Sequence, residues 1–248
     1  MPARLIMKLE SSGEINYKMS SLFHGALMEL IPEDYAEVLH QSRLHPYSQY
    51  IRLKDKNWYW IVNVLNQEAE EIILNQTLSH LSEFYLKRNE ITIHITETEY
   101  QKKPFSELTE KFYKEDANRF ISIQFLTPTA FKQNGQYIFY PDIRCIYQSL
   151  MNKYDSAMEE NLMMDADTLE QLCQDSRLVR YDLKSIRFDL EGIRVPAFLG
   201  SMTIRLTGTQ TMANFANVLF EFGTYSGIGI KTGIGMGAYQ LVSEGRMK

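Results

Sequence analysis

Residues 3–31 read ARLIMKLESSGEINYKMSSLFHGALMELI, and two apolar patterns in them give the first indication of the fold. Leucine and methionine at positions 5, 7 and 9 recur at every second residue, which predicts a β-strand over residues 3–9. Apolar residues at positions 19, 22, 23, 26, 27 and 30 recur at helical spacing, which predicts an amphipathic helix over residues 19–31. The chain is therefore expected to open with a strand followed by a helix.

The remainder of the first half continues this alternation. Pro32 ends the first helix, and residues 33–40 show a second, short helical pattern. A strand-rich stretch follows, clearest at residues 58–64, and then a helical pattern over 67–83 and an alternating strand over 91–96. The order of strand, helix, strand or hairpin, helix and strand matches a ferredoxin-like βαββαβ unit.

The second half repeats the same order of elements. Pro141 opens its first helix and Gly223 is predicted to end its last one. The patterns predict a strand over 120–125, a helix over 142–154, strands over 178–190 and 198–206, a helix over 211–222 and a strand over 236–242. We therefore predict an α+β protein with two ferredoxin-like (RRM-like) βαββαβ domains in tandem.

The boundary between the two predicted domains is set by element order, because no low-complexity linker separates them. We place the N-terminal domain at residues 1–117 and the C-terminal domain at residues 118–248. A chain of 248 residues is long enough for two small domains with their own cores.

The composition is that of a globular protein, with 44% hydrophobic and 23% charged residues. No apolar run approaches the roughly 20 residues of a membrane-spanning helix, and the N-terminus lacks the apolar core of a secretory signal. Cys145 and Cys173, the two cysteines, lack metal-ligand spacing. These features exclude membrane, disulfide-scaffold and zinc-finger proteins and predict a cytoplasmic location without membrane contact.

The charge is distributed unevenly along the chain. The formal net charge is −5, but residues 177–248 carry nine Lys or Arg against five Asp or Glu. Residues 155–175 hold seven acidic residues and no Lys or Arg, which predicts a solvated helix face or loop. A basic C-terminal third beside an acidic remainder is compatible with a polyanionic ligand bound on one face.

Residues 223–237 hold six of the 13 glycines in the chain. Such a stretch can bring backbone N–H groups close to phosphates, and Lys231 adds a positive charge. It is not a Walker A loop, since Ile230 precedes Lys231 where that motif needs glycine. It is not a Rossmann fingerprint either, because the predicted helix precedes it and the strand follows it. A purely structural glycine-rich hairpin is the alternative.

Three stretches of the sequence resemble one known family. One is a glycine pattern: Gly227-Ile228-Gly229, then five residues, then Gly235-Met236-Gly237. It resembles the glycine-rich signature of CRISPR-associated repeat endoribonucleases of the RAMP superfamily, the sixth Cas family. LTPTAFK at residues 126–132 resembles the opening of that family's second domain, and residues 39–48 resemble the stretch that holds its catalytic histidine. The resemblance covers roughly residues 3–242. It implies two ferredoxin-like domains and the processing of precursor CRISPR RNA.

Two of the five histidines are predicted to be catalytic. RNA cleavage without a metal ion needs one group to take the proton of the 2′-OH and another to protonate the leaving 5′-oxygen. Imidazoles suit both tasks, because their pKa lies near neutral pH. The resemblance implies that His40 is the catalytic histidine, while its partner His45 falls where some members carry a lysine. His80 and His94 are predicted to be structural or surface residues.

One position departs from the pattern of the family. Some members place a further catalytic tyrosine in the first helix, and Met28 occupies the matching position. His24, one turn earlier, and Tyr35, further along the chain, are the two residues that could replace it.

The predicted RNA contacts come from two parts of the chain. Arg43 and Arg52 belong to a basic region near His40 and His45, together with Lys54 and Lys56. An equal alternative is that these charges are solvated side chains of a strand or loop without contact to RNA. The glycine-rich stretch contributes Gly227, Gly229, Lys231, Thr232, Gly233, Gly235 and Gly237. The aromatic run at residues 58–60 could stack on bases, but we predict that it belongs to the core.

These observations lead to one prediction and two alternatives. The predicted function is a metal-independent endoribonuclease that cuts CRISPR repeats, leaves 2′,3′-cyclic phosphate and 5′-OH ends, and uses no cofactor. Its predicted partners are CRISPR repeat RNA and crRNA, with effector-complex subunits and a second copy of the chain as further candidates. One alternative is a non-catalytic crRNA-binding RAMP subunit of an effector complex. The other is a ferredoxin-like protein that binds a nucleotide or another protein.

Overall fold

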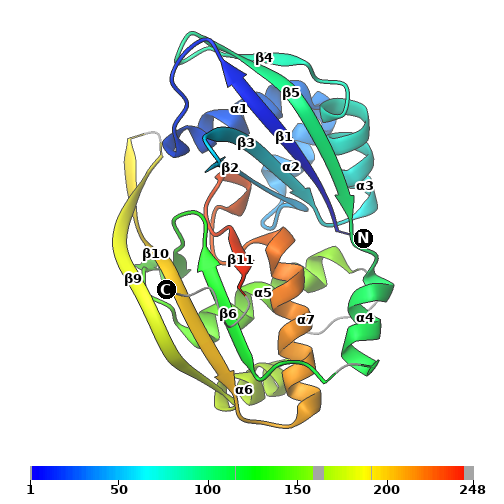
Figure 1. Ribbon diagram of the computed structural model, residues 1–248, viewed down its shortest axis with the longest axis vertical. Helices are drawn as coiled ribbons and strands as arrows, with labels where there is room; N and C mark the ends of the chain where they lie inside the picture. The colour runs from blue at the N-terminus through cyan, green and yellow to red at the C-terminus, as the bar shows by residue number, and fades with distance from the viewer. Residues whose placement is uncertain (1, 115, 159–164, 191, 243–248) are drawn as a thin grey trace.

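The computed structural model describes residues 2–114, 116–158, 165–190 and 192–242. Two antiparallel sheets, each with its own helices, form the upper and lower halves of the molecule in Figure 1. Of the acidic stretch at residues 155–175, positions 159–164 lie outside the described residues. The remainder includes the exposed first turn of α6 (Ala166–Gln174), which fits the predicted solvated helix.

The first sheet has the strand order β2-β3-β1-β5-β4. Without the edge strand β4, this is the order of a ferredoxin-like unit, in which the first strand lies between the third and the last. The strands are β1 (Ala3–Ser11), β2 (Tyr47–Lys54), β3 (Asn57–Val64), β4 (Glu83–Leu86) and β5 (Ile91–Lys102). The helices are η1 (Tyr17–Met19), α1 (Ser20–Leu30), α2 (Glu33–Gln41), α3 (Gln67–Ala69) and η2 (Glu70–Leu78).

The second sheet repeats the pattern in the order β11-β6-β10-β9. Its strands are β6 (Phe120–Phe125), β9 (Ser176–Leu190), β10 (Ile193–Leu206) and β11 (Tyr239–Leu241). The helices of this half are α5 (Ile143–Ala157), α6, α7 (Gln210–Ser226) and η3 (Thr232–Ile234). The helix α4 (Phe105–Lys114) follows β5, and β7 (Phe131–Gln133) pairs with β8 (Gln136–Ile138). The predicted α+β fold with two ferredoxin-like units is confirmed.

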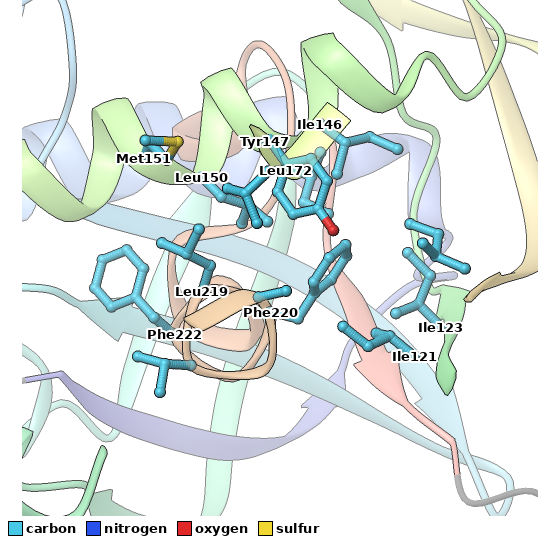
Figure 2. Close-up of a cluster of buried hydrophobic side chains, with 14 of the residues drawn as sticks. Ile121, Ile123, Ile146, Tyr147, Leu150, Met151, Leu172, Leu219, Phe220 and Phe222 are labelled. Carbon is cyan, nitrogen blue, oxygen red and sulfur yellow. The ribbon is translucent and has the colours of Figure 1, made fainter. Parts of the chain in front are cut away.

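Each half has its own apolar core between its sheet and its helices. In the second half, Ile121 and Ile123 of β6 face Tyr147 of α5 and Phe220 of α7, as Figure 2 shows. In the first half, Trp60 is fully buried, which confirms the predicted core role for that part of the aromatic run.

Several predicted boundaries were wrong. Two strands are longer than predicted, since β5 runs to Lys102 and not to residue 96, and β10 begins at Ile193 and not at residue 198. The last helix does not end at Gly223 but runs to Ser226, followed by Gly227 with φ 68°. Gly223 is needed for packing, because a Cβ there would lie 2.1 Å from the hydroxyl of Tyr239. The helix predicted to reach residue 83 ends at Leu78. All of it after Ala69 is a π-helix, whose wider turns shift the side chains away from 3.6-residue spacing. The final strand is shorter than predicted and spans Tyr239–Leu241.

The two halves meet at the C-terminal end of α7, where two side chains from the first sheet donate to two carbonyls. The guanidinium of Arg4 on β1 donates to the carbonyl of Thr224 at 2.5 Å and lies over the ring of Tyr225. Ser48 on β2 donates to the carbonyl of Tyr225 at 2.5 Å, and Asn63 on β3 links Arg4 to Ser48. The last carbonyls of a helix have no partner within it, so the first sheet supplies part of the cap of α7.

No helix within the described residues has both the length and the apolar character needed to cross a bilayer.

Candidate functional site

Three histidines and one tyrosine gather where α1, α2 and β2 approach one another. His24 comes from α1, His40 from the last turn of α2, His45 from the loop after α2, and Tyr47 is the first residue of β2. The helix α2 stops after Gln41 because the following serine turns back and donates its hydroxyl to a carbonyl of the helix. This local stop lets His40 and His45 approach one another closely enough for His40 to contribute to lowering the pKa of His45.

Tyr47 contacts two of the imidazoles. Its hydroxyl lies 3.0 Å from Nδ1 of His24. The His45 ring stacks on the Tyr47 ring, with centroids 5.4 Å apart and planes inclined by 14°. Because Tyr47 is fully buried, it provides a rigid support for both side chains.

Burial and mutual repulsion keep two of the imidazoles neutral. Burial, with a smaller effect from His45 and His40, lowers the pKa of His24 to about 4. Burial also lowers the pKa of His45, and His40 contributes in the same direction. His40 itself is exposed to solvent. The group therefore presents neutral, proton-accepting imidazoles at pH 7 beside an accessible histidine.

The structure distinguishes between the two residues that could replace a tyrosine in the first helix. His24 lies beside Tyr47 and interacts electrostatically with His45. Tyr35 belongs to the core: it is 5% exposed, and among the described residues its hydroxyl has no hydrogen-bond partner. Burial raises the pKa of Tyr35 to about 12. Met28 packs against the same core. His24 is therefore the residue placed to act with the other two histidines.

The glycine-rich stretch reaches this group from the second half. In Figure 1 the segment after α7 rises to β2, and η3 packs against β2 and α1. A Cβ at Gly233 would lie 2.9 Å from Nδ1 of His45 and 3.3 Å from the Tyr47 ring. Gly235 has φ 106°, and a Cβ there would lie 2.3 Å from that of Ser20. The structure thus brings the two predicted parts of the site into contact.

The remaining glycines of the stretch pack closely against neighbouring backbone. A Cβ at Gly229 or Gly237 would lie 2.2 Å or 2.0 Å from a carbonyl oxygen. Four of the glycine N–H groups already donate within the protein, those of Gly227, Gly229, Gly235 and Gly237. Because these four amides are used internally, close packing is the role that the geometry assigns to these glycines.

The predicted basic contacts lie apart from one another. Arg43 is exposed in the loop between His40 and His45. Arg52 donates to the side chain of Gln240 on β11 at 3.2 Å, so it bridges the two sheets. Lys231 is half-buried, with φ 59°, directly before η3.

Lys153 is a residue that the sequence analysis did not identify. It lies on α5, and its amine is buried beneath the glycine-rich stretch, where it donates to three oxygens of residues 226–232. Burial lowers the pKa of Lys153 to about 7. The sequence feature that could have indicated its burial is its position three residues after Leu150 and seven after Ile146, on the apolar face of the helix.

Among the described residues, no group of three or more His, Cys, Asp or Glu side chains is arranged to hold a metal ion. The three histidines of the site therefore approach one another without forming a ligand set.

Comparison with known proteins identifies consistent relatives. The family profile of the CRISPR-associated endoribonuclease Cas6 matches residues 123–239. Curated Cas6 endoribonucleases of Streptococcus thermophilus and Mycobacterium tuberculosis are each 36% identical over 220 residues, which cover 88% of this chain. The alignments cover 89% and 70% of those two proteins. A solved Cas6 product complex has a similar fold, with a TM-score of 0.82 and 20% identity over 98% of this chain and all of that chain.

Proposed function

Because the chain belongs to the Cas6 family of CRISPR-associated endoribonucleases, we propose that it cuts the repeats of precursor CRISPR RNA without a metal ion. The observation that carries the metal-independent mechanism is the group of histidines. Neutral His45 is stacked on Tyr47, His40 contributes to lowering the pKa of His45, and His45 in turn contributes to lowering the pKa of His24.

The proposed reaction is an in-line transesterification. The 2′-oxygen beside the scissile phosphate forms a bond to phosphorus while the bond from phosphorus to the 5′-oxygen breaks. The proton of the 2′-OH passes to a base on the protein, and an acid gives a proton to the leaving oxygen. The products are a 2′,3′-cyclic phosphate and a 5′-OH end.

We assign the two proton transfers to His45 and His40. A base must be neutral before the reaction, and burial keeps His45 in that state. His40 is accessible to solvent, so it can exchange protons with water and act as the acid. His24 is held by Tyr47 and, one turn before Met28, is placed to take the part of the tyrosine that some family members carry at the position of Met28.

We propose that the RNA contacts both halves of the molecule. Residues 1–117 form the domain that carries the histidines, and residues 118–248 form the domain that carries the glycine-rich stretch. Lys231, Arg43 and Arg52 bring positive charge to the RNA backbone. The glycine residues shape the surface, because several of their amides are occupied. Binding to effector-complex subunits and to a second copy of the chain stays a prediction.

The test is a cleavage assay with labelled repeat RNA in excess EDTA. We expect the unmodified protein to make a single cut and the His40→Ala variant to make none. His94→Ala is the matched control, because His94 lies on β5 and pairs with Glu83 at 3.1 Å. It should cleave like the unmodified protein. RNA with a 2′-deoxy nucleotide at the cut site should bind and stay intact. Repeat binding without any cleavage would instead indicate a carrier of crRNA.

A further inference from the structure

Lys153 is a charged side chain in the interior of the second half, with 6% of its surface exposed. Its amine donates to the carbonyl of Gly227 at 3.1 Å, the carbonyl of Ser226 at 3.3 Å and Oγ1 of Thr232 at 3.4 Å. Three acceptors match the three N–H donors that the amine has when it is protonated. No carboxylate of the described residues forms an ion pair with this amine, so these oxygens are its partners.

Two of those acceptors lie at the C-terminal end of α7. The carbonyls at a helix end carry partial negative charge and have no partner within the helix. A cation placed there is stabilised, and the carbonyls of Ser226 and Gly227 gain a donor. If the amine moved away, the buried carbonyl of Ser226 would lose this donor and that of Gly227 would keep only the hydroxyl of Ser226, at an energetic cost. The amine and the helix end therefore fix each other.

The third acceptor connects Lys153 to the histidines. Thr232 begins η3, and the next residue, Gly233, lies against the ring of His45. The methyl group of Thr232 also fills the space beside Gly227, where a Cβ would lie 2.8 Å from it. A continuous series of contacts thus runs from the amine through η3 to the imidazole.

We infer that Lys153 is a positioning residue for His45, because its hydrogen bonds tie Thr232 of η3 to the end of α7 and so hold η3 against the imidazole. The inference rests on the proposed function, in which His45 takes the proton of the 2′-OH. Lys153 acts through the glycine-rich stretch.

The first test measures the His45 ring directly, in the full chain without RNA. The C2–H resonance of His45 is assigned with a His45→Gln variant and titrated by NMR. In Lys153→Met we expect the pKa of His45 to rise toward the ordinary value, because Gly233 withdraws and the ring becomes hydrated. A folded Lys153→Met protein with the wild-type titration would overturn the inference.

Ser149→Ala provides a matched control on the same helix. The Ser149 hydroxyl accepts the N–H of Gly229 at 2.8 Å, so it also holds the glycine-rich stretch, but at a point before η3. We expect this variant to keep the wild-type titration of His45. An equal change in both variants would show a general loosening of the stretch and would contradict a specific role for Lys153.

The second test separates binding from chemistry. In Lys153→Met we expect single-turnover cleavage to slow about tenfold per folded molecule while the Kd for 2′-deoxy repeat RNA changes less than about twofold. An unchanged rate per folded molecule would count against the inference. If the unmodified protein cuts no repeat RNA, the proposed function fails, while the NMR titration still tests the link from Lys153 to His45.

If Lys153→Met does not fold, the Thr232→Val variant takes its place in the NMR titration. Valine keeps the shape of threonine but removes the one oxygen on η3 that the amine reaches. We expect the His45 titration to shift in the same direction by a smaller amount. A folded Thr232→Val protein without any shift would overturn the inference.

Discussion

The histidine segment, residues 24–47, and the glycine-rich segment, residues 223–237, meet at one place but differ in kind. The histidine segment carries ionisable side chains, and the exposed His40 touches solvent. The glycine-rich segment is largely buried, and its glycines fit against backbone and side chains of both halves. In the proposed reaction the histidine segment supplies the reacting imidazoles, whereas the glycine-rich segment supplies the packed surface beside them. The comparison indicates that motif residues of the same family can serve chemistry or packing.

The largest expected effect falls on the histidine segment. Replacing His45 with glutamine should lower the single-turnover rate of repeat cleavage by about 10²–10⁴-fold, because a proton acceptor is lost. The unfolding free energy should change little, since glutamine is also polar and the ring is only partly buried. Quench-flow cleavage and urea unfolding of the same preparation measure both. A variant that loses stability and activity together would erase the distinction between the two segments.

The glycine-rich segment should show the opposite response. Gly235→Ala places a Cβ 2.3 Å from that of Ser20 in a backbone conformation with φ 106°. Overpacking and strain together should cost about 3 kcal/mol of unfolding free energy. Urea unfolding followed by circular dichroism gives this value. Wild-type stability in Gly235→Ala would mean that α1 and η3 can separate without cost.

Lys153 makes the stability of the second half depend on pH, because it is an ionisable group buried beneath the glycine-rich segment. Burial lowers its pKa in the folded protein to about 7, whereas the unfolded chain titrates near 10.4. Between these values the unfolded chain holds a proton that the folded protein lacks, so this contribution to stability is lost as pH falls toward 7. No described charged group opposes or assists the shift.

The unfolding free energy of the wild type, relative to Lys153→Met, should therefore fall by about 1.4 kcal/mol per pH unit between pH 9.5 and pH 7.5. Below about pH 7 the difference should become constant, since both states then hold the proton. Urea unfolding of both proteins across this range provides the measurement. A difference that does not depend on pH would show that the amine is hydrated.

The smallest effect belongs to Gly25, an exposed glycine in α1 whose Cβ would meet nothing within 4 Å. Gly25→Ala should raise the unfolding free energy by about 0.5–1 kcal/mol, because alanine favours the helix. Thermal unfolding detects the change. A loss of stability in Gly25→Ala would show that the histidine segment also requires a glycine.

The fold was predictable because the order of apolar strand and helix patterns in the first half is repeated in the second half. Alternation over residues 3–9 and helical spacing over residues 19–31 fixed the first unit, and the second repeats its order. Gly223 misled the prediction, since a glycine that ends a helix and one that admits a tyrosine ring look identical in sequence. Tyr239, which decides between them, lies on a different element.

The site was predictable only in part. His40 and His45 were identified by resemblance, because a spacing of five residues does not place two rings together by itself. His24 was one of two alternatives. The contact of His24 with Tyr47 separates them, together with the buried hydroxyl of Tyr35, which has no hydrogen-bond partner among the described residues. Lys153 was missed because its acceptors lie more than 70 residues away along the chain.

The shared cap of α7 has a consequence for how such proteins diverge. Thr224 and Tyr225 rely on Arg4 and Ser48, which lie in the other half of the molecule and more than 170 residues earlier in the sequence. A recombinant that joins the first half of one homologue to the second half of another must inherit compatible residues at these positions. Otherwise it leaves buried carbonyls without donors. The two halves are therefore expected to be exchanged between lineages as one unit, and to accumulate compensating substitutions across this joint.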